Sequence, residues 1–461
     1  MSITLSIDQL LKYAENHGLV SGSDIIMSRN LLLDLLKINQ PATYDSGLCH
    51  DTDLESILAA LLQYAYENGL IEDNTTTYRD LFESKIMGIL TPRHAEVIAK
   101  FNAFSNKADA VNYFYALSKA TNYIKTARIQ KNLRWMHPTE CGELEITINL
   151  SKPEKDPKEI AKALTATEKT YPKCLLCVEN VGFAGHINHP SRQNHRIIPI
   201  TLGDEDWYLQ YSPYAYYNEH CIPLCGQHRP IAIHRGTFEK LLDFLQLFPQ
   251  YFVGSNADLP IVGGSILNHD HFQGGRHKFP IEKAAAYAEY TLMGVKAELI
   301  KWPMSVIRLS SKHRSEIVNA ATDILAKWRG YEDETVNIIP YSGKTPHNTV
   351  TPIARINSQN EYEFDLVLRN NRTNADYPDG IFHPHPHVHH IKKENIGLIE
   401  VMGLAILPGR LATQLNVTDR SGEMAYIGET FHEVLKHAGV FKSDSSGMEA
   451  FHRFLKTCGT P

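Results

Sequence analysis

The first third of the chain has the spacing of amphipathic helices. Apolar residues recur every three or four positions from Leu54 to Ala65, and a shorter run from Ile7 to Ala14 repeats the pattern. Positions three and four apart share one face of a helix, so each run predicts a helix with one buried side. Residues 1–115 hold no group of side chains with evident chemistry. We therefore expect a helical N-terminal region that acts as a cap or an oligomer surface.

The pattern changes to alternation in the middle of the chain. Apolar residues occupy every second position from Leu144 to Leu150, which is typical of a strand with one buried face. Further strands are expected in His195–Leu202 and Trp207–Leu224, followed by a helix that buries Phe238 to Phe248. The apolar run Leu259–Leu267 then predicts another strand, which leads directly into a histidine segment.

The last third repeats this order of elements. Thr349–Ile356 and Glu363–Arg369 have the composition of two strands, and a second group of histidines precedes the apolar stretch Ile396–Leu407. The repetition predicts an internal duplication of one α+β unit.

The resulting domain plan has three parts. We expect a helical region at 1–115, a first half with the candidate chemistry at 116–285, and a second, related half at 286–461. Each half would combine an antiparallel sheet with helices.

Composition narrows the class of protein. The chain has 461 residues and a formal net charge of −6, without a long basic run, which argues against nucleic-acid binding. No apolar run is long enough to span a bilayer, and the N-terminus lacks the features of a signal peptide. Seven cysteines are too few for a disulfide framework. We expect a cytoplasmic protein with no membrane partner.

The strongest candidate chemistry lies in the segment 269–273, which reads His-Asp-His-Phe-Gln. In an extended strand His269, His271 and Gln273 face the same side. A neutral imidazole is a good nucleophile, and we expect its second nitrogen to donate to a backbone carbonyl, which fixes the tautomer. The Gln273 amide can donate to a phosphate oxygen without transferring a proton. The neighbouring glycines let backbone amides approach phosphate. Alone, a His-x-His segment is more often a metal pair or a surface accident; the flanking glycines, Gln273 and the apolar strand before the segment favour the nucleophile.

A second candidate is the C-x-x-C pair of Cys174 and Cys177. This spacing lets two thiolates bind one zinc ion, with histidines such as His228 and His269 completing the site. The alternatives are two buried cysteines or a redox pair. The polar segment between Asn188 and Arg196 is a third candidate, because the Arg192 and Arg196 guanidiniums suit phosphate. A solvated polar loop explains that segment equally well.

Several segments together resemble one known family. They are Gly254–Leu267, Phe272–Gly275, Tyr217–His220, His347–Pro352 and Asn395–Gly403. The chain is similar over most of its length to the galactose-1-phosphate uridylyltransferases, and more so to their second, mainly bacterial class. This resemblance implies two halves of the histidine-triad type, ping-pong exchange of UMP between UDP-glucose and galactose 1-phosphate, and a uridylyl-histidine intermediate.

The resemblance also implies roles for individual residues. His271 would be the nucleophile and Gln273 the partner of the phosphate, while Cys174, Cys177, His228 and His269 would bind zinc. Apart from the resemblance, we expect Arg192, Arg196, Asn256, Gly264 and Ser265 to bind substrate. The substrates would be UDP-glucose or UDP-galactose and hexose 1-phosphates, and a homodimer would be compatible.

The sequence departs from the family's first class at two positions. Asp270 replaces a proline and Phe272 replaces a glycine in the motif of that class. Asp270 should point to the other face of the strand, away from phosphate. A second metal site involving His387 and His389 is a weaker hypothesis. Two other functions remain open: a nucleotide hydrolase or nucleotidyltransferase of the histidine-triad superfamily, and a non-catalytic, zinc-stabilised binding protein.

Overall fold

The computed structural model describes residues 3–39, 53–151, 171–264, 266–414 and 422–459. It is an α+β protein, as predicted, and it divides into two compact units. The first unit contains residues 1–131, 151–199 and 208–215, and the second contains 132–150, 200–207 and 216–461. Among the described residues, no helix is long and apolar enough to cross a membrane.

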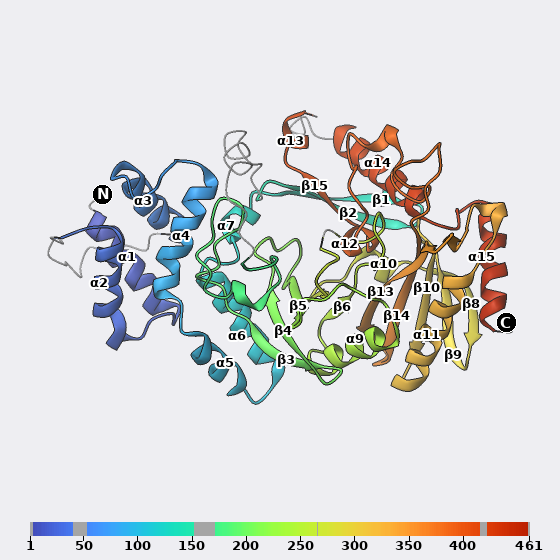
Figure 1. Cartoon of the computed structure of the whole chain (residues 1–461), viewed down its shortest axis with the longest axis horizontal. Coiled ribbons are helices and arrows are strands. Elements are labelled where there is room, and N and C mark those ends of the chain that lie inside the picture. Colours follow the sequence, from blue (N-terminus) through green and yellow to red (C-terminus); the bar gives the residue numbers. More distant parts are fainter. Residues whose placement is uncertain (1–2, 40–52, 152–170, 265, 415–421, 460–461) are drawn as a thin grey trace. The chain divides into compact units, whose positions relative to one another are not determined.

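The first unit begins with a series of helices, two of which cover the runs 7–14 and 54–65 that the sequence predicts as helical (Figure 1). They are α1 (Ile3–Asn16), α2 (Ile25–Leu35), α3 (Leu54–Glu67), α4 (Thr76–Leu90), α5 (His94–Asn102), α6 (Lys107–Ala120) and α7 (Thr126–Ile129). The Asp53 side chain caps α3 by accepting from Ser56 N at 3.0 Å. The apolar residues that follow helical spacing, Ile57, Leu58, Leu61, Leu62 and Ala65, are buried, so the spacing predicted from the sequence is confirmed.

A ten-stranded sheet dominates the second unit. Its spatial order is β3-β4-β5-β7-β6-β13-β14-β10-β9-β8. The strands are β3 (Ile198–Leu202), β4 (Glu205–Tyr211), β5 (Cys221–Cys225), β6 (Phe252–Gly254), β7 (Gln273–Gly275), β8 (Ala286–Leu292), β9 (Val295–Ile300), β10 (Val306–Ser311), β13 (Asn348–Ile356) and β14 (Tyr362–Asn370).

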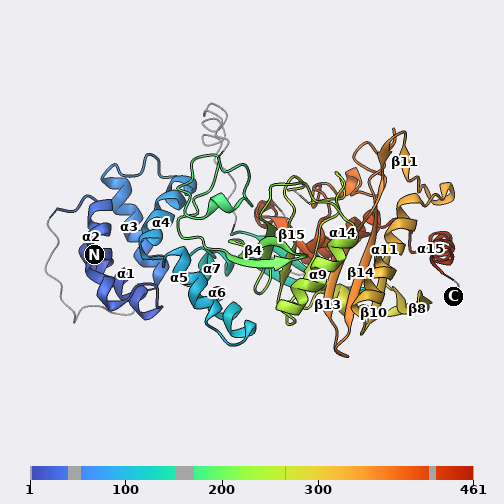
Figure 2. The same ribbon diagram turned by 60° about the horizontal axis from the view of Figure 1, so that its bottom comes forward.

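This sheet confirms the internal duplication. In each half, counted in chain order, the strands lie in the spatial order first, second, third, fifth, fourth. In each half a helix also follows the third strand: α9 (Arg235–Leu247) in the first and α11 (Arg314–Gly330) in the second. The two fourth strands, β6 and β13, pair antiparallel through Val253 and Ala354. That pairing joins the halves into one sheet (Figures 1 and 2).

The two faces of the sheet are covered differently. Helices α9 and α11 pack against one face. The other face contributes Phe252, Val306, Ile353 and Val367 to a large apolar core. That core also takes in a three-stranded sheet of order β1-β2-β15 and helices that include α10, α12 and α14. These elements are β1 (Leu133–Thr139), β2 (Gly142–Asn149), β15 (Leu404–Pro408), α10 (Pro280–Lys283), α12 (Leu398–Val401) and α14 (Gly422–Ala438).

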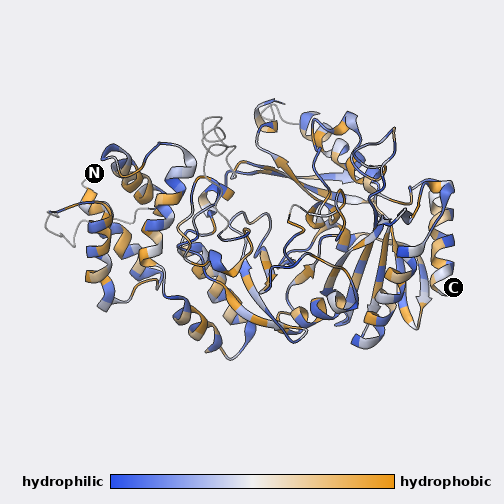
Figure 3. Cartoon of the chain, viewed as in Figure 1, coloured by the Kyte–Doolittle hydropathy of each residue, from blue (hydrophilic) through white to orange (hydrophobic). Residues whose placement is uncertain are grey.

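The remaining elements are short or peripheral. They are β11 (Tyr341–Ser342), β12 (Thr345–Pro346), α13 (Leu411–Gln414) and α15 (Ser445–Cys458), and the 3-10 turns at Gly22–Asp24, Val178–Asn180, Glu334–Val336 and Pro386–Val388. Hydrophobic and hydrophilic residues alternate around the helices, as expected for helices with one buried side (Figure 3).

One expected strand is absent. The apolar run 259–267 is irregular in its described part, and the strand of this region is the earlier segment Phe252–Gly254. Ile261 has a φ of 71°, and a Cβ on Gly263 would lie 2.6 Å from the Ala257 carbonyl oxygen. Pro260 and the glycines break the strand ladder, so the described part of this apolar run folds as a partly buried loop instead. The boundaries proposed from the sequence, 1–115, 116–285 and 286–461, stay a prediction.

Candidate active site

His271 lies on extended backbone immediately before β7. It forms an antiparallel bridge with Leu224 of β5, and Phe272 N donates to Pro223 O at 2.8 Å. The Phe272 ring stacks on Trp207 with a centroid distance of 4.6 Å. A Cβ on Gly274 would approach Phe244 of α9 to 3.5 Å. Gly274 therefore faces α9, and Gln273 and His271 face the opposite side of the sheet.

The imidazole of His271 is held in one tautomer. Its Nδ1 donates to the backbone carbonyl of His269 at 2.8 Å, as expected from the sequence, and this leaves the lone pair on Nε2. The side chain is 6 % exposed. Burial, which disfavours the cation, lowers the pKa of His271 to about 4; the bond to His269 opposes that shift. The imidazole is therefore neutral near pH 7, as a nitrogen nucleophile must be.

Asp270 points away from this imidazole, as the alternation predicts. Its carboxylate forms an ion pair with Arg229 at 3.2 Å, and Arg229 also pairs with Glu205 at 2.5 Å. Burial raises the pKa of Asp270, and Arg229 acts in the opposite direction. Asp270, which occupies the position of a proline in the first class of the family, therefore links its strand to Arg229.

Gln273 contacts a residue that the sequence analysis did not single out. Nε2 of His220 lies 3.3 Å from Oε1 of Gln273. The His220 ring is buried and stacks on Tyr217 with a centroid distance of 4.4 Å. His220 and Gln273 are 53 positions apart, so only the segment Tyr217–His220 itself could have drawn attention to this histidine.

The two glycines after Gln273 permit close packing of the backbone. A Cβ on Gly274 would lie 2.7 Å from Phe252 O, and one on Gly275 would lie 2.8 Å from both Glu219 O and the Tyr217 ring. Arg276 N donates to Asn218 O at 3.2 Å. Small residues are therefore required here so that the turn bearing His220 can lie against β7.

Asn256 is oriented by the start of α12. Its Oδ1 accepts from Leu398 N at 2.9 Å, and a Cβ on Gly264 would lie 2.4 Å from its Nδ2. The absence of a side chain at Gly264 thus makes room for the amide of Asn256. Ser265, the third residue expected to bind substrate in this segment, lies outside the described residues.

The two arginines of the first unit have different surroundings. Arg196 donates to the carbonyl oxygens of Pro92 at 2.8 Å, His195 at 2.8 Å and Gln193 at 3.0 Å. Burial lowers the pKa of Arg196 to about 10. Arg192 lies over the Tyr123 ring at 5.4 Å, and its guanidinium donates to Ser191 O over a long distance of 3.5 Å. Arg196 is therefore committed to the backbone to a greater degree than Arg192.

The cysteine pair has the geometry of two zinc ligands. The sulfurs of Cys174 and Cys177 lie 3.6 Å apart in the first unit. Two sulfurs bound at ~2.3 Å to one tetrahedral zinc would be roughly 3.8 Å apart. Leu176 N donates to Cys174 Sγ at 3.4 Å, and the Asn180 amide donates to the carbonyl oxygens of both cysteines at 2.8 Å. The donor atoms and the turn that carries them fit a metal ion.

The histidine pair lies in the second unit. Donor nitrogens of His228 and His269 lie within 4.8 Å of each other, and the ring centroids are 4.9 Å apart. Nε2 of His269 donates to Cys225 O at 2.8 Å, so the lone pair is on Nδ1. A metal-bound histidine usually has its other nitrogen hydrogen-bonded in this way.

The second group of histidines is only partly as expected. His387 Nε2 lies 2.7 Å from Glu433 and close to His437, and these three could hold a metal ion. His389 instead donates to Pro384 O at 2.8 Å. His437 Nδ1 accepts from His385 N at 3.3 Å, which places the ring proton on the nitrogen nearer Glu433. That tautomer is poorly suited to metal binding on the Glu433 side.

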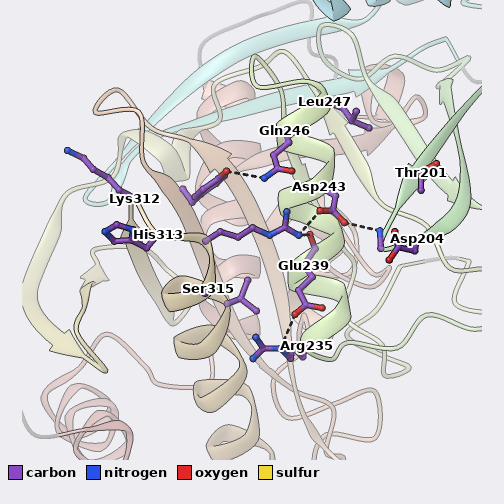
Figure 4. Close-up of a pocket in the computed structure, with 14 residues that line it drawn as sticks. Thr201, Asp204, Arg235, Glu239, Asp243, Gln246, Leu247, Lys312, His313 and Ser315 are labelled. Carbon is purple, nitrogen blue, oxygen red and sulfur yellow. Dashed lines mark hydrogen bonds and ion pairs between the residues drawn. The ribbon is translucent and has the colours of Figure 1, made fainter.

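A cavity of about 920 Å³ lies on the helical side of the sheet (Figure 4). It is lined by charged residues that pair with one another, including Arg314 with Asp243 at 2.5 Å and Arg235 with Glu239 at 2.9 Å. None of the predicted site residues lines it. The candidate active site around His271 and Gln273 lies on the opposite face, since Gly274, which alternates with them along the strand, faces α9.

Comparison with known families supports the resemblance. The chain matches the N-terminal domain of galactose-1-phosphate uridyl transferase over residues 28–230 and the C-terminal domain over residues 244–422. It is 52% identical to the galactose-1-phosphate uridylyltransferase of Caldanaerobacter subterraneus subsp. tengcongensis, covering 98% of this chain and 97% of that one. The enzyme of the same name from Bacillus subtilis is 49% identical, covering 100% and 98% of the two chains.

Among solved structures, yeast Ap4A phosphorylase Apa2 in complex with Ap4A is a distant likeness. The TM-score is 0.39 at 10% identity, over 75% of this chain and 96% of that chain. At this level the likeness contributes nothing to the assignment of the site.

Proposed function

Because this chain belongs to the galactose-1-phosphate uridylyltransferase family, we infer that it is a nucleotidyltransferase that exchanges UMP between hexose 1-phosphates, and we propose His271 as its nucleophile. The proposal is carried by one observation: Nδ1 of the buried His271 donates to His269 O, which leaves a neutral Nε2 lone pair. The substrates would be UDP-glucose or UDP-galactose and the corresponding hexose 1-phosphates.

The reaction would proceed in two balanced steps. Nε2 of His271 attacks the α-phosphorus of UDP-glucose, a nitrogen–phosphorus bond forms, and the bond to the bridging oxygen breaks. Glucose 1-phosphate leaves with the electron pair as a stable anion, so it needs little help from an acid. Galactose 1-phosphate then attacks the same phosphorus, the nitrogen–phosphorus bond breaks, and UDP-galactose is released with the imidazole neutral again.

Gln273 would stabilise the phosphoryl oxygens during both steps. It lies on the same face as His271, two positions along the strand. A carboxamide N–H donates to a developing negative charge and has no acidic proton to transfer. This property favours transfer of UMP to a sugar phosphate over transfer to water. It therefore argues against the alternative function of a nucleotide hydrolase.

We assign a structural zinc ion to the two ligand pairs. Cys174 and Cys177 would supply two sulfurs, and His228 and His269 two nitrogens. Zinc with four protein ligands has no open position for substrate, so it would contribute folding free energy and no chemical step. The support is the 3.6 Å sulfur separation in one pair and the hydrogen-bonded tautomer of His269 in the other.

Among the residues expected to bind substrate, Arg192 is the better candidate for a phosphate contact. Arg196 donates to several backbone carbonyls, so a contact to phosphate would require it to give those bonds up. We propose that Asn256 and Gly264 shape the substrate site by fixing the loop before His269. The predicted homodimer stays a prediction.

Intact-mass analysis tests the function directly. The protein is mixed with UDP-glucose alone, and the expected product is a stoichiometric UMP adduct with release of glucose 1-phosphate. Adding galactose 1-phosphate should remove the adduct and yield UDP-galactose. Sequential kinetics with no adduct, or an adduct that forms equally well in His271→Ala, would contradict the proposal.

A further inference from the structure

A single hydrogen bond decides which end of the Gln273 amide is presented to the substrate. A carboxamide has an oxygen that accepts and a nitrogen that donates, and rotation by 180° exchanges them. A phosphoryl oxygen can only accept, so the transfer reaction needs the –NH₂ end. In the structure, Oε1 of Gln273 lies 3.3 Å from Nε2 of His220.

The His220 ring is fixed by its surroundings. It stacks on Tyr217 at 4.4 Å, with the ring planes 30° apart, and Tyr217 OH donates to Gly274 O at 3.2 Å. The intervening Glu219 accepts from Tyr251 OH at 2.5 Å and forms an ion pair with Arg276 at 3.3 Å. These contacts tie the turn from 217 to 220 to β7, to the residue before β6 and to the residue after β7.

We propose that His220 is a positioning residue, whose Nε2–H donates to Oε1 of Gln273 and thereby turns the Gln273 –NH₂ toward the phosphoryl oxygens. This inference rests on the proposed function of His271 and Gln273. His220 takes no part in bond making. It keeps the amide from rotating to the orientation in which its oxygen would face, and repel, the phosphoryl oxygens.

The close approach of the turn to β7 supports this role. A Cβ on Gly275 would lie 2.8 Å from Glu219 O and from the Tyr217 ring, so the absence of a side chain there lets His220 reach Gln273. His220 and Gln273 also lie in the same compact unit: His220 immediately precedes β5, Gln273 begins β7, and these two strands pair through Cys221 and Gly274.

Two substitutions separate the hydrogen bond from the packing. His220→Phe keeps a ring that can stack on Tyr217 but removes the donor. His220→Gln places a side-chain N–H near the position of Nε2. We expect His220→Phe to slow uridylylation by UDP-glucose by about 10–100-fold, with a change in KM of less than about 3-fold, because the bond orients a donor that acts in the transition state. His220→Gln should recover most of the lost rate.

A double-mutant cycle with Gln273→Ala gives the decisive result. If His220 acts through Gln273, adding His220→Phe to Gln273→Ala should cost little further rate. An equal cost of His220→Phe in both backgrounds would overturn the inference, and so would an unchanged rate in the single variant. If His220→Phe fails to fold by circular dichroism, His220→Asn, which also lacks a donor at the Nε2 position, replaces it in the same cycle.

The wild-type adduct assay keeps the two proposals distinct. Absence of a His271-dependent UMP adduct would refute the proposed function and the inference with it. A normal adduct together with additive effects of His220→Phe and Gln273→Ala would refute the inference alone.

Discussion

Nδ1 of His271 and the backbone carbonyl of His269 lie 2.8 Å apart, so the strand that carries the imidazole also fixes its tautomer. The bond is local, between residues two positions apart, and it does not require substrate. The nucleophile is therefore oriented before the nucleotide binds, which reduces the reorganisation needed in the transition state.

Removal of this imidazole should abolish transfer. We expect His271→Ala to bind UDP-glucose but to lose exchange by a factor on the order of 10⁴ or more, because no other group can take the place of the nucleophile. Exchange is measured by formation of UDP-galactose, and binding by calorimetry. In His271→Gly, free imidazole should restore part of the activity through the vacated space; retention of the adduct in His271→Ala would argue against the assignment.

The pH dependence of the first half-reaction should reflect the depressed pKa. Burial lowers the pKa of His271 to about 4, so the imidazole stays neutral as the pH falls through the ordinary value of ~6.5. The rate of adduct formation from UDP-glucose should therefore be flat between about pH 5.5 and 8 and fall only as the pH nears 4. UDP-glucose alone is used because its diphosphate diester keeps its charge over this range. An acid limb centred near pH 6.5 would contradict this prediction.

The same group should make stability depend on pH. As the pH falls, His271 of the unfolded chain takes up its proton at a higher pH than His271 of the folded chain does. The contribution of His271 to the free energy of unfolding is therefore fully present above ~6.5 and is lost as the pH falls toward 4. Urea unfolding of wild type and His271→Gln at pH 7.5 and pH 5 measures it. The wild type should lose more stability between these two values than the variant; equal losses would count against a depressed folded-state pKa.

Much of this architecture could be predicted from the sequence. The segments 349–356 and 363–369, predicted as strands from their composition, match β13 and β14 to within one residue at each end, because strands in a buried sheet combine apolar and β-branched residues over a defined length. The direction of Asp270 followed from the two-residue period of an extended strand. A backbone carbonyl as the partner of His271 was expected from the need to fix the tautomer of a nucleophilic imidazole.

Other features could not be predicted because they depend on distant parts of the chain. Leu259–Leu267 has the composition of a strand, yet Pro260 and the glycines leave it as a loop. The partnership of His220 and Gln273 links β7 to the turn before β5, and neither local spacing nor composition records it. The cysteine spacing predicted the sulfur separation, but composition alone could not show which nitrogen of His269 is hydrogen-bonded.

Replacement of Gln273 by histidine should change the fate of the intermediate. A histidine at this position could donate a proton as well as a hydrogen bond, which makes water a more competitive acceptor of UMP. We expect Gln273→His to transfer UMP to galactose 1-phosphate more slowly and to release free UMP several-fold faster from the isolated adduct. Chromatography of products after removal of UDP-glucose measures both rates. An adduct as resistant to water as that of the wild type would contradict this account of Gln273.

The tight packing around Gly275 can be tested by comparing an alanine substitution there with one at a glycine that has open space around it. Gly275→Ala should lower stability by about 1–3 kcal/mol and also slow transfer, because its Cβ would lie 2.8 Å from Glu219 O. Gly330→Ala is the control: it ends α11, no atom lies within 4 Å of the added carbon, and a gain of up to about 1 kcal/mol is expected. Chemical denaturation and adduct rates are measured for both. Gly275→Ala with wild-type stability and rate would show that the turn is not tightly packed.

The zinc proposal predicts a specific loss of metal. Cys174→Ser should remove about one equivalent of zinc and lower the thermal midpoint, because the metal-binding free energy stabilises only the folded chain. Elemental analysis of the purified protein measures the content. Cys458→Ala, at a buried position in α15, is the control and should keep the metal. Fully active and equally stable protein after complete removal of metal by a chelator would exclude the structural role.

The parallel pairing of β15 with β2 has a consequence for synthesis of the chain. Leu404 pairs with Glu145, so the two strands are separated by roughly 260 residues. During translation, the hairpin of β1 and β2 must therefore wait, with one edge unpaired, until most of the polypeptide has left the ribosome. Unpaired edges invite association with other chains, and distant pairings form slowly. We therefore expect the nascent protein to depend on chaperones, and truncations that lack β15 to aggregate rather than to accumulate as a folded catalytic half.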